Sequence, residues 1–193
     1  MKKVYLSVLA GVAIGIAAIC NLKSGGIIGA SLFAFALSAI VWNKWILFTG
    51  KAGFAGTRKE WFELVPMLFY NAVGVVLAVY MSCCVEAVMP AAMKLVEARK
   101  AAGFGIILPS ILTGLIMTVS VKSAREGQWI PLLLGIPTFV MSGFPHCVAD
   151  IAYYCVAKEY PIGLWVLSII GNFIGCNLPT IFRFIKEQKT EKC

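Results

Sequence analysis

The sequence predicts an all-α integral membrane protein with six transmembrane helices in an inverted 3+3 repeat, in which the second and fifth spans are broken. Three observations predict this fold class: an apolar composition, six long apolar runs, and polar interruptions that recur in both halves. Of the 193 residues, 60% are hydrophobic and only 13% are charged, and the mean hydropathy is +0.87. Soluble proteins carry about 25% charged residues, so this composition indicates a bilayer environment.

The six apolar runs have the length of membrane helices, which take about 17 to 25 residues to cross a bilayer. They leave no room for a separate soluble domain, so we expect one transmembrane domain, 1–193, with repeat halves of about 1–88 and 89–193. The segment between the third and fourth runs, which holds Pro90 and several charges, is expected to be a loop. The expected spans are Val4–Cys20, Ile27–Trp42 resuming as Ile46–Gly50, Phe62–Val85, Phe104–Val121, Ile130–Ala157 and Pro161–Phe184.

The first run is interpreted as a retained span rather than a cleaved signal peptide. It continues beyond the usual apolar segment of about 7 to 15 residues, and no A-x-A site follows before Lys23. It also carries Ser7, Gly11 and Gly15 at four-residue spacing. Such a stripe of small residues predicts close helix packing in a membrane.

The basic residues lie in the short segments between apolar runs, although the net charge is +8. This distribution indicates a membrane protein and no nucleic-acid partner. Since Lys and Arg accumulate on the cytoplasmic side of short loops, both termini are expected to be cytoplasmic in a multi-pass protein of the cytoplasmic (inner) membrane. The larger group is Lys2, Lys3, Lys51, Arg58, Lys59, Lys122, Arg125, Arg183, Lys186, Lys189 and Lys192, and the smaller is Lys23, Lys94, Arg99, Lys100 and Lys158.

The fifth run is interrupted in its middle by Ser142-Gly143-Phe144-Pro145-His146, which contains the only His of the chain. Gly and Pro break a membrane helix there, and freed backbone groups at that depth are tolerated only where protein or a water-filled cavity satisfies them. An ionisable residue at membrane depth is typical of a transport path. The second run is interrupted by Asn43-Lys44-Trp45, unless the helix ends at Trp42 and places Lys44 at the interface.

The interruptions recur in the two halves. Asn71-x-x-Gly74 in the third run is followed 101 residues later by Asn172-x-x-Gly175 in the sixth, and the breaks before Thr49 and at His146 lie 97 residues apart. With three spans in each half, the second half enters the membrane with opposite polarity, as in the inverted repeats of many transporters. Broken spans that correspond in such folds meet near the midplane.

Three segments resemble the formate/nitrite transporter family. Leu47-Phe48-Thr49 is similar to the family's L-F-T, Gly143–Asp150 (GFPHCVAD) to its G-F-E-H-S-V-A-N, and Ile169–Gly175 (IIGNFIG) to its G-N-I-I-G. The resemblance covers nearly the whole chain in order and spacing. It implies homopentamers of six-span protomers with an aquaporin-like inverted repeat and a separate pore through each protomer.

Carried over by residue, the resemblance implies a narrow pore with a central His and an apolar constriction on either side of it. Thr49 is matched to the loop residue that faces His146, and Lys94 to a basic residue at the outer vestibule. For the constriction residues, lipid-facing or core packing is the alternative interpretation. The implied pathway residues are His146, Thr49, Phe33, Leu37, Phe139, Phe48, Leu47, Asp150, Asn172, Lys44 and Lys94.

The chain departs from the family pattern at several of these positions. Ile46 stands where the family has an acidic residue, Pro145 replaces Glu, Asp150 replaces Asn, and the Asn expected near Pro109 is missing. Asp150 lies four residues after His146, so a continuing helix would bring it to the same face, where a carboxylate favours the protonated imidazole. Lys44 has no family counterpart and adds a positive charge near the second-span break.

The expected function is a channel or transporter that passes a small monovalent anion of the formate, nitrite or hydrosulfide class, with proton transfer from the central His as one mechanism. The alternatives are a channel for a small neutral solute or water, and a non-transporting membrane subunit. No enzyme, cofactor or metal site is expected, because a single His and seven scattered Cys make no catalytic or metal-binding set.

Overall fold

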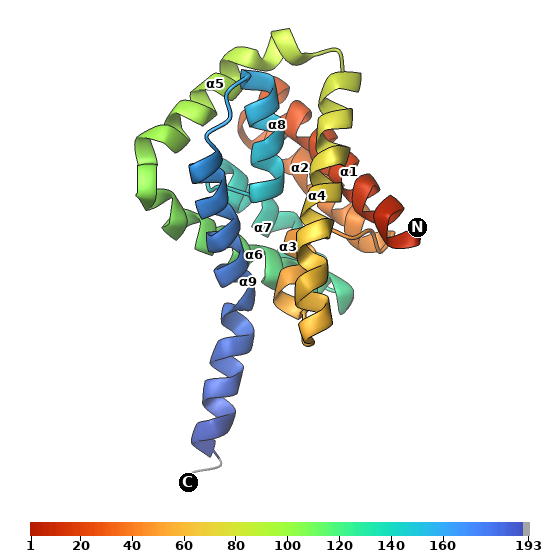
Figure 1. Cartoon of the computed structure of the whole chain (residues 1–193), viewed down its shortest axis with the longest axis vertical. Helices are drawn as coiled ribbons and strands as arrows, with labels where there is room; N and C mark the ends of the chain where they lie inside the picture. Colours follow the sequence, from red (N-terminus) through yellow and green to blue (C-terminus); the bar gives the residue numbers. More distant parts are fainter. Residues whose placement is uncertain (191–193) are drawn as a thin grey trace.

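The computed structural model describes the backbone of residues 1–190 and the side chains of residues 1–181. Every regular element in that part of the chain is a helix (Figure 1). The α-helices are α1 (Lys2–Ser24), α2 (Gly26–Trp42), α3 (Phe48–Lys51), α4 (Arg58–Met81), α5 (Val85–Ala102), α6 (Ile107–Arg125), α7 (Ile130–Met141), α8 (Cys147–Ala157) and α9 (Ile162–Thr190), with 3₁₀ turns η1 (Ala52–Phe54) and η2 (Gly103–Ile106).

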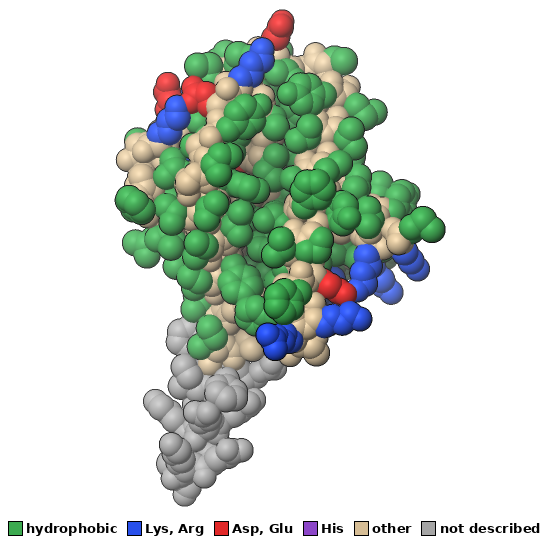
Figure 2. All heavy atoms as spheres, in the orientation of Figure 1, with side chains coloured by type: hydrophobic (Ala, Val, Ile, Leu, Met, Phe, Trp, Pro, Cys, Tyr) green, Lys and Arg blue, Asp and Glu red, His purple; other side chains and the backbone are tan. Residues whose placement is uncertain are grey.

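Four helical stretches are long and apolar enough to cross a membrane: Lys2–Ser24, Arg58–Met81, Val85–Arg125 and Ile162–Ile181. The remaining apolar helices are shorter because the chain breaks where the sequence predicts, after Trp42 and after Met141. Figure 2 shows apolar side chains over the middle of the visible face and charged side chains toward its two ends. This distribution is typical of a protein whose middle part lies in the lipid bilayer.

The sequence predicted a loop at residues 86–103. In the structure these residues belong almost entirely to α5. The helix lies along the outside of the bundle (Figure 1) and packs against α8. Its buried residues, Val88, Ala92, Val96 and Arg99, recur at helical spacing, whereas the other charged residues of the segment lie on its exposed face. The prediction failed because this helix has one buried face rather than an apolar surface all round.

Small residues let the long helices touch. A Cβ atom added to Gly11 would overlap the backbone carbonyl of Asn71, so α1 and α4 are in backbone contact, as the predicted small-residue stripe required. In the second half, a Cβ atom on Gly114 would overlap the carbonyl of Asn172, which brings α6 equally close to α9. The close contacts of α1 with α4 and of α6 with α9 therefore fix the positions of Asn71 and Asn172, the asparagines of the predicted repeat.

Candidate functional site

The two breaks meet at a hydrogen bond between Thr49 and His146. Thr49 lies in α3, directly after the first break, and His146 is the last residue of the second. Thr49 Oγ1 lies 2.9 Å from His146 Nε2, and both side chains are buried. The sequence predicted that these two residues face each other, and the structure brings them into direct contact.

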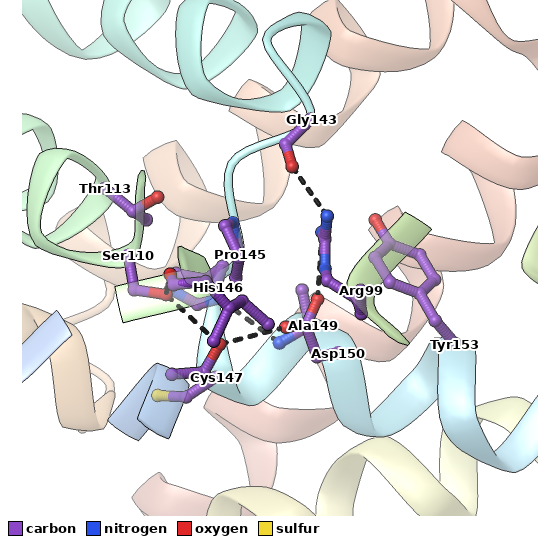
Figure 3. Close-up of polar contacts among 12 residues, drawn as sticks. Arg99, Ser110, Thr113, Gly143, Pro145, His146, Cys147, Ala149, Asp150 and Tyr153 are labelled. Carbon is purple, nitrogen blue, oxygen red and sulfur yellow. Dashed lines mark hydrogen bonds and ion pairs between the residues drawn. The ribbon is translucent and has the colours of Figure 1, made fainter. Parts of the chain in front are cut away.

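His146 also caps the helix that follows it. Its Nδ1 accepts a hydrogen bond from the backbone N–H of Ala149 at 3.2 Å, so the imidazole serves as the N-cap of α8 (Figure 3). Because Nδ1 is an acceptor, the ring proton of a neutral imidazole sits on Nε2. Nε2–H then donates to the Thr49 hydroxyl oxygen.

Aromatic side chains line one side of this polar contact. The Phe139 ring stacks on the His146 ring with centroids 5.7 Å apart, and Phe33 meets Phe139 edge-on at 6.3 Å. The predicted apolar site residues are all buried, which excludes a lipid-facing position for each of them. These residues are Phe33, Leu37, Leu47, Phe48 and Phe139.

Two asparagines hold the ends of the breaks. Asn71 Oδ1 accepts from Phe48 N at 2.9 Å, and its Nδ2 donates to Ser7 O at 2.8 Å and Ile46 O at 2.9 Å. Backbone groups freed by a broken helix thus find partners inside the protein, as a membrane interior requires.

Asn172 repeats this arrangement at the second break. Its Oδ1 accepts from Cys147 N at 2.8 Å, and its Nδ2 donates to Ser110 O at 2.8 Å and to Pro145 O at 3.0 Å. The residues held alike in the two breaks are 99 positions apart. His146 therefore corresponds to Leu47, rather than to Thr49 as the sequence spacing suggested.

The sequence predicted that Asp150, four residues after His146, would face the imidazole. In the structure it does not. Its carboxylate pairs instead with Arg99, with Oδ1 3.3 Å from Nη2, and its Oδ2 accepts from Ser168 Oγ at 3.5 Å. Arg99 Nη1 donates to the carbonyl of Gly143 in the break at 2.6 Å, which Figure 3 shows together with the ion pair. The Asp150 carboxylate is therefore paired with Arg99 rather than with the imidazole. Through the hydrogen bond from Arg99 to Gly143, this buried ion pair links α5 to the second break.

Arg99 is a site residue that the sequence did not reveal. Lys94 lies on the exposed face of α5, whereas Arg99 lies on the buried face of the same helix. The spacing of Val88, Ala92 and Val96 would have placed Arg99 on the inner face, had the segment been recognised as a helix. Its Nε is buried and, within the described residues, lacks a hydrogen-bond partner.

Lys44 lies in the first break with a positive φ of 56° and an exposed side chain. The helix does end at Trp42, as one interpretation held, and a short helix follows the break, as the other held, although it begins at Phe48 rather than at the expected Ile46. Lys44 borders a cavity of about 400 Å³ whose lining includes Leu37 and Leu47. The described residues contain no group of three His, Cys, Asp or Glu side chains that could hold a metal ion.

Two solved channel structures superpose on nearly the whole chain. A structure described as a pentameric formate channel with formate bound superposes with a TM-score of 0.78, covering 97% of this chain and 96% of that chain at 16% identity. The chain has the formate channel fold. A second structure, described as an FNT family ion channel, superposes with a TM-score of 0.71, covering 92% of this chain and 84% of that chain at 17% identity.

No family model matches the sequence, and no curated protein matches it. The formate channel fold is therefore recognised from structure and from a few short segments. Two of those segments, Leu47-Phe48-Thr49 and the stretch around His146, lie at the two breaks of this chain. At this level of identity the superposition establishes the fold, and the chemistry has to be argued from the residues of this chain.

Proposed function

We propose that this protein is a member of the formate/nitrite transporter family that passes a small monovalent anion of the formate, nitrite or hydrosulfide class. It assembles as a homopentamer with one pore in each protomer. It lies in the cytoplasmic membrane with both termini cytoplasmic. The observation that carries the proposal is the buried contact between His146 Nε2 and Thr49 Oγ1 at the point where the two breaks meet.

The proposed path runs past this contact between apolar side chains. Phe33 and Leu37 from α2 and Phe139 from α7 form the apolar constrictions, and Leu47 and Phe48 directly precede Thr49. Moving a bare anion between such side chains is costly because its hydration is lost. A polar group at the centre offsets part of that cost, and the Thr49 and His146 pair is the polar group available.

His146 acts in this proposal as a hydrogen-bond donor through Nε2–H. To give a proton to the anion and remain neutral, the ring would need a second proton on Nδ1, which now accepts from Ala149 N. That step would break the cap of α8. The geometry therefore supports hydrogen bonding to the passing anion more directly than proton donation, which stays a coupled step that costs the cap.

The proposal includes an inverted repeat with halves of about 1–88 and 89–193. Asn71 and Asn172 support it, since each binds the first N–H of a short helix and two carbonyls at matching positions. In this arrangement the two asparagines bind the backbone groups of the breaks, and Thr49 Oγ1 and His146 Nε2 are not used for that purpose.

Passage of an uncharged solute is the second candidate, and one observation favours it. The Arg99 guanidinium, the cation bonded to the second break, is neutralised by Asp150. With a neutral imidazole as well, the centre carries no net charge. Such a centre suits the neutral acid form of the substrate, or a small neutral solute, better than a permanent positive site would.

A liposome experiment separates these candidates. Purified protein in proteoliposomes is mixed by stopped flow with formate, nitrite, hydrosulfide or urea at several pH values, and voltage-clamp recording on the same preparation reports current. Anion passage with a current that reverses with the anion gradient supports an anion channel. Uptake that carries no current and rises as pH falls supports passage of the neutral acid. Urea flux with no anion flux contradicts the proposal.

A further inference from the structure

Sulfur-bearing side chains are concentrated at the turn between α4 and α5. Five of the fourteen Cys and Met residues of the chain lie within positions 81–93, whereas the other nine are spread over the remaining 180 positions. The turn lies at the end of the bundle away from the C-terminus (Figure 1). The proposed pore chemistry uses none of the five residues, which are Met81, Cys83, Cys84, Met89 and Met93.

Two adjacent thiols are accessible in this turn. Cys83 is exposed and Cys84 is half-buried, and both are free. The Cys83 Sγ lies 3.7 Å from the carbonyl oxygen of Met81, the last residue of α4. Cys83 has a positive φ of 52°, a backbone conformation that Gly adopts at lower cost than other residues. The turn therefore carries a thiol where Gly would be the less strained residue.

Thioethers lie on both sides of the thiol pair in the chain. Met81, before the pair, is 79% exposed. Met89, after it, lies in the second turn of α5 and packs against the same apolar core as Cys84, the N-cap of that helix. Because a long side chain in a helix leans toward the helix N-terminus, the Met89 thioether lies toward Cys84. Two thiols and two thioethers are thus available around one turn.

This set of donors favours a soft metal ion. Thiolate and thioether ligands select Cu(I), whereas hard ions such as Mg²⁺ and Ca²⁺ take oxygen ligands. A structural zinc site takes four Cys or His ligands, and this turn offers two. The described residues contain no group of three His, Cys, Asp or Glu side chains that could hold a metal ion. Thioethers are not among those four ligand types, and here they complete the set.

We propose that Met81, Cys83, Cys84 and Met89 bind one soft monovalent metal ion, Cu(I) or Ag(I). Two S–H bonds break, both protons go to the solvent, and two metal–thiolate bonds form. The thioethers bind without losing a proton. The metal keeps its oxidation state, so the step needs no oxidant or reductant. The complex carries one net negative charge, which is favoured at the N-terminus of the 18-residue helix α5.

A competition experiment with the full-length protein in detergent tests the site. The protein is reduced with a non-thiol reductant without oxygen, and it then competes for Cu(I) with the coloured chelator bicinchoninate. The double variant Cys83→Ser/Cys84→Ser should bind one Cu(I) fewer per chain than the wild type. Met81→Leu and Met89→Leu nearly conserve volume. Each should weaken Cu(I) binding by about 10-fold or more, since even the loss of an outer-shell partner costs that much.

Matched controls come from sulfur atoms elsewhere in the chain. Cys20 is a half-buried free thiol in α1, and Met141 is a 58% exposed thioether at the end of α7. Cys20→Ser and Met141→Leu should keep the wild-type affinity and stoichiometry. Equal losses in the controls and in the turn variants would show general binding to sulfur and would overturn the proposal.

The identity of the ligands is tested separately. X-ray absorption of the Cu(I) complex should show only sulfur neighbours, and Ag(I) should displace Cu(I) from the same site. Glu86 lies in the first turn of α5, and Glu86→Gln should leave Cu(I) binding unchanged. Oxygen or nitrogen neighbours, a loss in Glu86→Gln, or displacement by Zn²⁺ would contradict the soft sulfur site.

Folding of the variants is checked by thermal unfolding in detergent. If the double Cys variant unfolds at a lower temperature than the wild type, Met81→Leu decides, because the Met81 side chain is largely exposed. Wild-type Cu(I) affinity in Met81→Leu and Met89→Leu would then overturn the proposal. The measurement needs no transport, so the metal site stands or falls independently of anion passage in liposomes.

Discussion

Asn71 and Asn172 bind equivalent backbone groups in the two halves of the chain. Each carboxamide accepts from the first N–H of a short helix and donates to the carbonyl of the residue two positions before it, and to a carbonyl of a neighbouring long helix. Only an amide offers one acceptor and two donors in this geometry. The two breaks therefore depend on one side chain each.

Replacing Asn172 by Leu should destabilise the protein by roughly 2 to 4 kcal/mol, because Cys147 N, Ser110 O and Pro145 O would lose their buried partner. Thermal unfolding in detergent measures the loss. Asn177→Leu is the control on the same helix, since Asn177 donates to one carbonyl of its own helix. Equal shifts for the two variants would contradict the structural role of Asn172.

The Arg99 and Asp150 pair should be costly to break singly. Asp150→Leu or Arg99→Met each leaves an uncompensated buried charge, and each should cost about 3 to 5 kcal/mol in unfolding free energy. The double variant should be more stable than either single one, because no charge is left. Glu63→Gln, which breaks the exposed pair with Lys3, should cost about 1 kcal/mol or less. Additive losses in the double variant would show that the two residues do not interact.

His146→Asn and His146→Phe separate capping from pore chemistry. Asn retains an acceptor for Ala149 N at the N-cap, so stability should stay near wild type, whereas Phe should lose about 1 kcal/mol. Both variants lack Nε2–H, and both should lose anion flux and its pH dependence in liposomes. Wild-type flux in both would remove His146 from the mechanism.

Gly175→Ala should disturb the contact between α9 and α6, because the added Cβ would overlap the carbonyl of Ile111. Overpacking of this kind costs about 1 to 3 kcal/mol. Gly163→Ala serves as the control on the same helix, since nothing lies within 4 Å of its added Cβ. Thermal unfolding of the two variants should differ by that amount, and equal stability would show that the helices can move apart freely.

The sequence predicted the second break because Gly, Pro and His are conspicuous inside an apolar run, and the first because Asn43 and Lys44 interrupt one. It predicted the contact of Thr49 with His146 through the family resemblance. It did not predict α5, since charges on one face of a helix resemble those of a loop. Arg99 was missed for that reason. The orientation of Asp150 was missed with it, because its partner lies 51 residues away in sequence. The expected sixth span, Pro161–Phe184, lies within α9 and the residue before it, although side chains beyond residue 181 lie outside the described part.

The cap on α8 couples protonation of His146 to the conformation of the first turn of that helix. A second proton on His146 would turn Nδ1 from an acceptor into a donor that points at the Ala149 N–H, so two donors would oppose each other. The ring would have to swing away or the first turn of α8 would have to open. Taking up a proton at this position is therefore a mechanical event, which moves a helix end that Asn172 also holds through Cys147 N.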